Sequence, residues 1–197
     1  MKKRIIISLI IFIIWTILVC TNNINWFNDS VYDFLYSLKS NTFTNIMKIF
    51  TFFANTKAIV FLSLLSLLGL FFKTKKPLYL VGTIIVSTIL NNVLKIIFRV
   101  NRPEHYRFII AGGFSYPSGH AMASMTFYGF FIIFVINSNL DKKYKYILSI
   151  IIFIFILFIG LSRIYLGVHY PSDIIGGWLI SFILLNIANE LVKKEGF

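Results

Sequence analysis

The chain has 197 residues, of which 58% are hydrophobic and 13% are charged, whereas an ordinary soluble domain is about 45–50% apolar and about 25% charged. Its 19 Lys and Arg residues and 7 Asp and Glu residues give a formal net charge of +12. This composition excludes a soluble globular domain and a disordered chain, and it predicts an all-α integral membrane protein. The basic excess is interpreted as loop charge beside a lipid bilayer rather than as a nucleic-acid surface. The single cysteine, Cys20, allows no internal disulfide, and no Cys/His cluster offers a metal site.

Apolar stretches long enough to cross a bilayer, which takes about 20 residues, recur along the chain. They predict six membrane-spanning helices at about residues 5–21, 57–72, 78–98, 118–136, 146–161 and 173–192. These spans form a six-transmembrane-helix bundle with short loops, so residues 1–197 are expected to make one membrane domain. The first stretch follows three basic residues and resembles a signal peptide, but no small-residue cleavage site follows it, and we interpret it as a retained span.

The longest segment between predicted spans, residues 22–56, carries apolar side chains at steps of three and four residues. They are Phe43, Ile46, Met47, Phe50 and Phe53. This spacing predicts a short amphipathic helix over residues 43–53 in the outer membrane interface, and a loop packed on the bundle is the alternative.

Basic residues gather at helix ends that would all face one side of the membrane. These residues are Lys2, Lys3, Arg4, Lys73, Lys75, Lys76, Lys142, Lys143, Lys145, Lys193 and Lys194. Cytoplasmic loops carry an excess of Lys and Arg, so this side is predicted to be the cytoplasm, with both termini on it.

Polar residues in this apolar chain are concentrated in three segments, residues 95–103, 116–120 and 162–173. Polar groups are costly inside a membrane and usually mark a functional site there. Counting spans along the chain places all three segments at the extracytoplasmic end of the bundle, where helix packing can bring them together.

The first segment holds Lys95, Arg99 and Arg102, spaced four and then three residues apart. This spacing predicts that they share one face of a helix, where like charges repel and a bound anion would relieve the repulsion. Arg and Lys both suit phosphate oxygens. The alternative is a set of side chains that extend toward lipid head groups.

The other two segments add the groups that could act on such an anion. Ser118 is a candidate N-cap, Gly119 permits close backbone approach, and His120 can exchange a proton near neutral pH. His169 and Asp173 are four residues apart, so the carboxylate can hold one imidazole nitrogen while the other attacks. Taken singly, each feature also fits a helix cap or an interfacial histidine.

Together these residues resemble the three-part signature of the type 2 phosphatidic acid phosphatase (PAP2) superfamily. The matching pattern is Lys95-x6-Arg102-Pro103, Pro117-Ser118-Gly119-His120 and Ser162-Arg163-x5-His169-x3-Asp173. It covers residues 95–173 without a departure from the family's motifs.

The resemblance implies an acid phosphatase-like core and a lipid phosphatase that needs no metal or other cofactor. His169 would be the nucleophile that forms a phosphohistidine, Asp173 would orient it, and His120 would be the general acid. The phosphoryl oxygens would be held by Lys95, Arg102, Ser118, Gly119, Arg163 and Ser162.

The implied substrate is a membrane lipid phosphate, reached from the bilayer at the extracytoplasmic face of the cell membrane. We expect undecaprenyl diphosphate, with phosphatidylglycerophosphate or phosphatidic acid as alternatives, and no nucleic acid or obligate protein partner. Two further interpretations of the function stay open. The phosphoryl group could pass to an acceptor other than water, or the protein could be an inactive phospholipid-binding or transport protein.

Overall fold

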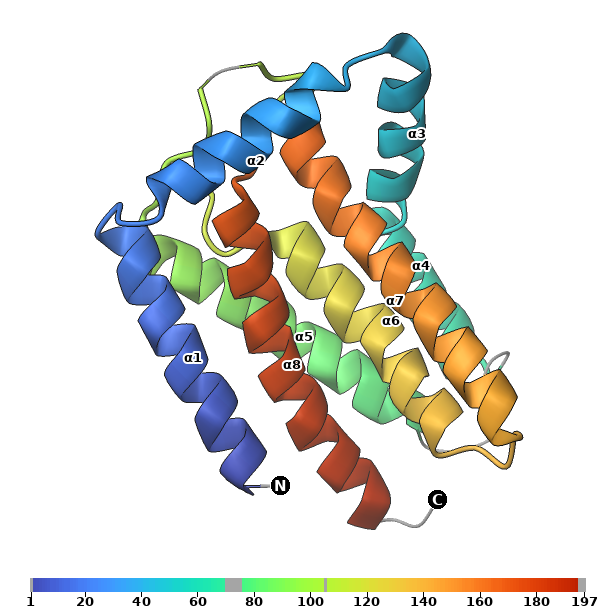
Figure 1. Ribbon diagram of the computed structural model, residues 1–197. Helices are drawn as coiled ribbons and strands as arrows, with labels where there is room; N and C mark the ends of the chain where they lie inside the picture. Colours follow the sequence, from blue (N-terminus) through green and yellow to red (C-terminus); the bar gives the residue numbers. More distant parts are fainter. Residues whose placement is uncertain (1, 70–75, 105, 195–197) are drawn as a thin grey trace.

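The computed structural model describes residues 2–69, 76–104 and 106–194, and all regular structure within these ranges is helical. Within these described ranges, eight helices follow one another (Figure 1). They are α1 (Lys2–Cys20), α2 (Asn25–Ser37), α3 (Asn41–Phe52), α4 (Thr56–Leu67), α5 (Lys76–Phe98), α6 (Gly119–Ile136), α7 (Lys142–Tyr165) and α8 (Pro171–Lys194).

Five of these helices, α1, α5, α6, α7 and α8, are each long and apolar enough to cross a membrane. A bend of 45° separates α3 from α4, and the pair would supply a sixth span if it crosses as one unit. The chain is therefore a multi-pass membrane protein, and its described residues hold five candidate spans, or six if the bent pair is counted.

The predicted second span, residues 57–72, is wrong in its extent. Helix α4 has only 12 residues and ends at Leu67, and Gly69 follows with a φ of +78°. A residue with left-handed backbone terminates a helix, and glycine adopts that conformation without steric cost. The apolar composition continues through this glycine, so hydropathy alone extends the span too far. Residues 70–72 lie outside the described part of the chain.

The predicted fifth span, residues 146–161, is longer in the structure, because α7 runs through 24 residues from Lys142 to Tyr165. Its first turn is basic, and the prediction left those charged residues in the loop. The hydrogen-bonded helix nevertheless continues through them.

The segment between α1 and α4 holds two helices. The helix predicted over residues 43–53 is α3, which begins after the N-cap Ser40 and packs along α7. Met47 of α3 is buried against Tyr165 and Leu166 at the end of α7. Helix α2 had no predicted counterpart, and it lies across one end of the bundle (Figure 1). The location of α3 in the membrane interface stays a prediction.

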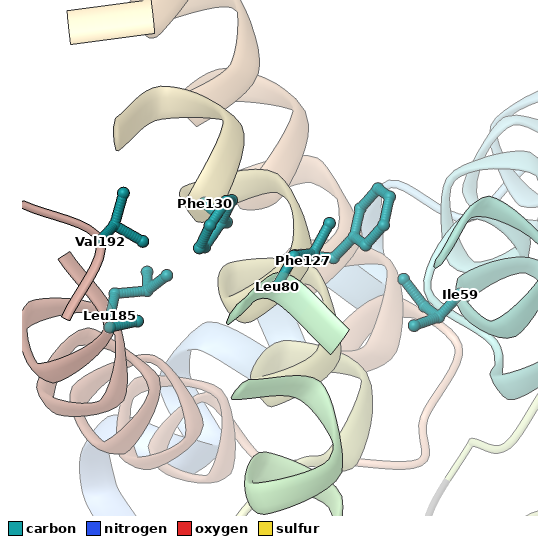
Figure 2. Close-up of a cluster of buried hydrophobic side chains, with 7 residues drawn as sticks. Ile59, Leu80, Phe127, Phe130, Leu185 and Val192 are labelled. Carbon is teal, nitrogen blue, oxygen red and sulfur yellow. The ribbon is translucent and has the colours of Figure 1, made fainter. Parts of the chain in front are cut away.

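The bundle is organised around α6, which packs against α5, α7 and α8, while α1 packs on α8. Figure 2 shows one core cluster, in which Ile59 of α4, Leu80 of α5, Phe127 and Phe130 of α6 and Leu185 of α8 are buried together. The outward faces of α1, α5 and α7 keep many isoleucines exposed. An exposed isoleucine surface suits lipid chains rather than water.

The three polar segments lie at one end of this bundle, as the alternation of spans predicts. The end of α5, the start of α6, the end of α7 and the start of α8 meet near α2 (Figure 1). The basic helix ends, including Lys76 and Lys142, lie at the opposite end with the start of α1 and the end of α8. Lys73 and Lys75 lie outside the described residues. The cytoplasmic location of this basic end stays a prediction.

Close packing of α7 on α8 gives a test of the fold. A Cβ added to Gly160 of α7 would lie 2.4 Å from the Trp178 ring and 2.8 Å from Ile174, whereas one added to Gly82 of α5 would meet nothing within 4 Å. We expect Gly160→Ala to lower the free energy of unfolding in detergent by about 1–3 kcal/mol through overpacking. Gly82→Ala is the matched control and should be neutral or mildly stabilising, since alanine favours helix. Thermal unfolding curves that coincide for the two variants would contradict this packing.

Candidate active site

Four helix ends bring the motif residues together. Ser118 caps α6, because its side chain accepts a hydrogen bond from the Ala121 N–H, which confirms the predicted N-cap. The Ser118 N–H in turn donates to the backbone carbonyl of Asp173 over 3.0 Å. The start of α6 is therefore bonded to the first turn of α8, and the second and third motifs form one unit.

Helix α1 supports this unit from the side. The hydroxyl groups of Thr16 in α1 and of Tyr116, the residue before Pro117, share a hydrogen bond of 2.8 Å. The Trp15 indole N–H donates to the carbonyl of Ser172 over 3.0 Å. Both contacts hold the backbone beside the motifs in place.

His169 and Asp173 form the buried pair that their spacing predicts. The imidazole Nδ1 lies 3.2 Å from Asp173 Oδ2, and the two residues are 2% and 0% exposed. On the other side of the ring, Arg102 Nη1 lies 3.2 Å from Nε2. A guanidinium can only donate, so Nε2 must accept and the imidazole proton must sit on Nδ1. His169 therefore carries an unprotonated Nε2 that faces the cations.

The surroundings of His169 keep the ring neutral. Burial, followed by the positive charges of Arg163, Arg102 and Lys95, lowers the pKa of His169 well below its usual value. A protonated imidazole has no lone pair to offer, so this environment preserves the nucleophilic form.

The cations are held by backbone carbonyls of the loop before α6. Arg102 donates to the carbonyls of Gly112 and Gly113 and, over 2.7 Å, to that of Val168. Lys95 donates to the carbonyls of Phe114 and Ser115 over 2.5 and 3.0 Å. The loop dipoles thus offset the mutual repulsion of the two cations and fix their positions.

Arg163 is the most buried of the three cations at 5% exposed. Its Nη1 donates to the hydroxyl of Thr51 in α3 over 2.6 Å, and its buried Nε has no hydrogen-bond partner in the described structure. A buried donor without a partner is costly, and a bound anion would satisfy it.

His120, in the first turn of α6, interacts electrostatically with Arg163, His169, Arg102 and Lys95. It also lines a cavity of about 300 Å³ between α4, α5 and α6, together with Val60, Ile84 and Ala123. Beside it, a Cβ added to Gly119 would lie 3.1 Å from Asn91 Oδ1, and the approach of a phosphate to this backbone stays a prediction. The cavity beside His120 therefore combines these apolar side chains with polar ones of α5, among them Ser87 and Asn92.

The prediction that Lys95, Arg99 and Arg102 share one helix face is wrong. Helix α5 ends at Phe98, and Arg99 has a φ of +50° and an exposed side chain that bonds back to Ile96. Pro103 disfavours helical backbone at the residue before it, which explains why the helix stops short. Arg102 reaches His169 from the loop instead.

Ser162 is buried in the last turns of α7, and its role as a phosphate ligand stays a prediction. Its buried hydroxyl donates to the Ile159 carbonyl within α7 over 2.6 Å. Two other residues contact the site although no motif contains them, namely Thr51, which bonds Arg163, and Ser115, which bonds His169 and Asp173. Neither residue stands out in the sequence, because both are ordinary hydroxyl residues without a distinctive spacing.

The donor set suits an anion rather than a metal ion. In the described ranges, no three His, Cys, Asp or Glu side chains are grouped so that they could hold a metal. Three cations, a neutral imidazole and the N–H groups that open α6 converge instead. Such an arrangement can bind a phosphoryl group and attack its phosphorus.

Comparison with known proteins agrees with this chemistry. Over 132 residues the chain is 32% identical to phosphatidylglycerophosphatase B of Bacillus subtilis, an alignment covering 64% of this chain and 65% of that protein. Over 139 residues it is 31% identical to undecaprenyl-diphosphatase of Sulfolobus acidocaldarius, covering 65% of this chain and 63% of that protein. The chain thus spans slightly less than two thirds of the length of each relative.

The fold also matches a solved structure. The crystal structure of a transmembrane PAP2-type phosphatidylglycerolphosphate phosphatase from Bacillus subtilis superposes with a TM-score of 0.88 and 22% identity, over 96% of each chain. The family model of the PAP2 superfamily matches residues 76–197, which include all three motifs. On this match, the chain belongs to the PAP2 superfamily.

Proposed function

We propose that this protein is a membrane lipid phosphatase that works through a phosphohistidine on His169. The observation that carries the proposal is the pair of contacts on the His169 ring, with Asp173 at Nδ1 and Arg102 at Nε2. They leave an unprotonated nitrogen beside three cations, which is the arrangement that attack on a phosphate ester requires.

In the first step, the substrate phosphate displaces Arg102 from the lone pair of His169 and is held by Lys95, Arg102 and Arg163. Nε2 attacks phosphorus, the P–N bond forms, and the P–O bond to the lipid breaks. His120 donates its proton to the departing lipid oxygen. Asp173 stabilises the positive charge that develops on the His169 ring.

In the second step, water enters where the lipid oxygen was and attacks phosphorus. His120, now neutral, accepts the proton from this water, the P–N bond breaks, and inorganic phosphate and the starting enzyme result. Fixed cations supply the charge stabilisation in both steps, so we propose that the reaction needs no metal.

The cavity beside His120 supports a lipid as the leaving group. Nucleophile and leaving group lie on opposite sides of phosphorus in an in-line displacement. The group that leaves must therefore be next to His120, where the cavity of about 300 Å³ has a mixed lining. Ile59 and Val60 of α4 and Ile84 of α5 supply apolar side chains, and α5 also contributes Ser87, Thr88, Asn91 and Asn92. The size of the cavity falls at the lower end of the range for ligand pockets, about 300–1,000 Å³.

The names of the two relatives suggest which lipid to test first. One is named for phosphatidylglycerophosphate and the other for undecaprenyl diphosphate. We propose undecaprenyl diphosphate, because its recycling takes place at the extracytoplasmic face, where the positive-inside rule puts this site. Phosphatidylglycerophosphate and phosphatidic acid are the alternative substrates.

The first prediction concerns His169. Detergent-purified protein in EDTA should release phosphate from at least one of the three lipids, and the ranking of kcat/KM identifies the substrate. His169→Ala should lower the rate by about 10³-fold or more, since it removes the nucleophile. Wild-type protein should also form an acid-labile phosphoprotein that the variant lacks.

A folded wild-type protein that binds phosphate without turning over any lipid would instead favour the binding or transport function. Transfer of the phosphoryl group to an added alcohol instead of water would identify a transferase that uses the same phosphohistidine intermediate.

The second prediction separates the two histidines. His120→Ala should lower the rate on phosphatidic acid by about 10²–10⁴-fold, because an alkoxide leaves only when protonated. The same variant should lose far less activity on p-nitrophenyl phosphate, since p-nitrophenolate leaves without a proton. Steady-state rates on both substrates test this, and equal losses would rule out His120 as the general acid.

The third prediction concerns the cavity. Val60 of α4 lines it and is 51% exposed, whereas Val86 of α5 is 50% exposed and lines a separate groove between α5 and α8. Val60→Trp should raise the KM for the lipid about tenfold, equivalent to roughly 1.4 kcal/mol, and leave p-nitrophenyl phosphate hydrolysis unchanged. Val86→Trp is the matched control. A KM that rises in both variants or in neither would place the lipid elsewhere.

A further inference from the structure

Ser115 occupies a position that neither the motifs nor the mechanism assigns. It lies in the loop between α5 and α6, two residues before Pro117, and it is 0% exposed. Its hydroxyl oxygen is 3.1 Å from His169 Nδ1 and also bonds Asp173 Oδ2. One buried hydroxyl therefore touches both members of the proposed nucleophile pair.

The proton positions in this group follow from Arg102. Because Arg102 donates toward Nε2, the His169 proton lies on Nδ1 and points at both Asp173 Oδ2 and Ser115 Oγ. The Ser115 hydroxyl then donates to Asp173 Oδ2. Ser115 thus accepts from the imidazole and donates to the carboxylate, which closes a ring of three hydrogen-bonded groups.

The carboxylate oxygen of Asp173 that bonds His169 also accepts hydrogen bonds from other groups. Asp173 Oδ2 also accepts the Tyr170 N–H over 2.8 Å, while the buried Oδ1 has no hydrogen-bond partner in the described structure. The Nδ1–H group therefore competes with two other donors for one carboxylate oxygen. The Ser115 oxygen gives it a second acceptor.

The backbone of Ser115 is held by the first motif. Its N–H donates to the Val100 carbonyl over 2.7 Å, and its carbonyl accepts from Lys95 Nζ over 3.0 Å. The hydroxyl is therefore presented to His169 from a backbone fixed at both sides. Lys95 and His169 are linked through this single residue.

We propose that Ser115 is a positioning residue that fixes the ring orientation of His169 by giving its Nδ1–H group a second acceptor. The inference rests on the proposed function, and it adds that Ser115 acts through His169 without touching substrate. During attack on phosphorus the His169 ring becomes positive, so its Nδ1–H bonds strengthen. Loss of the hydroxyl should therefore slow the chemical step and leave phosphate binding unchanged.

The kinetic test compares Ser115→Ala with Ser181→Ala in the full-length protein. Ser181 of α8 is also 0% exposed, but it bonds Met122 and Thr126 within the bundle, away from His169. We expect Ser115→Ala to lower kcat on the best lipid substrate about 10- to 100-fold with KM within about twofold, as for other residues that orient a reactive histidine. Ser181→Ala should keep the wild-type kcat.

A double-mutant cycle tests whether Ser115 acts through the pair. In the Asp173→Asn background, removing the Ser115 hydroxyl should cost less than about threefold, since the ring it helps to orient has already lost its carboxylate. Additive losses, a change confined to KM, or the same kcat for Ser115→Ala and Ser181→Ala would overturn the proposal.

The second readout needs no turnover. NMR of ¹⁵N-histidine-labelled protein should show a hydrogen-bonded His169 Nδ1–H resonance, identified by its loss in His169→Ala, that exchanges faster with solvent in Ser115→Ala. An unchanged exchange rate of this Nδ1–H group in the variant would refute the role of Ser115. Wild-type protein that is inactive on every lipid would refute the proposed function, whereas the Nδ1–H measurement would still decide the inference about Ser115.

Discussion

The buried carboxyl group of Asp173 is the point on which the site depends. One of its oxygens bonds His169, Ser115 and the Tyr170 N–H, and its backbone carbonyl accepts from Ser118 at the start of α6. These contacts join α8 to the loop before it, to the loop after α5 and to α6. A displaced Asp173 would therefore disturb the histidine, the helix N-terminus and the loop together.

Three cations in one buried site would repel each other strongly in the absence of compensation. Hydrogen bonds supply this compensation. The backbone carbonyls of residues 112–115 and 168 accept hydrogen bonds from Lys95 and Arg102, and the Thr51 hydroxyl accepts one from Arg163. Neutral dipoles hold these side chains without neutralising them. The positive charge therefore stays available for a phosphoryl group, and, after burial, the same charge helps to lower the pKa of His169.

The bundle separates a polar end from an apolar body. Apolar clusters such as the one around Phe127 and Phe130 hold α4, α5, α6 and α8 together, while α2 lies across the polar end (Figure 1; Figure 2). His120 stands at the boundary, because it interacts electrostatically with the cations and also lines the cavity between α4, α5 and α6. This boundary suits a substrate with a charged phosphate and an apolar tail.

The sequence by itself determined the class of protein, the approximate positions of five spanning helices, the Ser118 cap and the pairing of His169 with Asp173. These features depend on composition, on hydropathy over windows of about 20 residues, or on neighbours four residues apart, all of which are local. Only the tertiary structure decided that Arg102 acts from a loop, that Ser162 bonds its own helix, and that Thr51 and Ser115 support the cations and the histidine. The contacts of Arg102, Thr51 and Ser115 join residues 54 to 112 positions apart, and that of Arg102 also depends on where α5 stops. No local pattern encodes such contacts, because they arise when separate helix ends pack together.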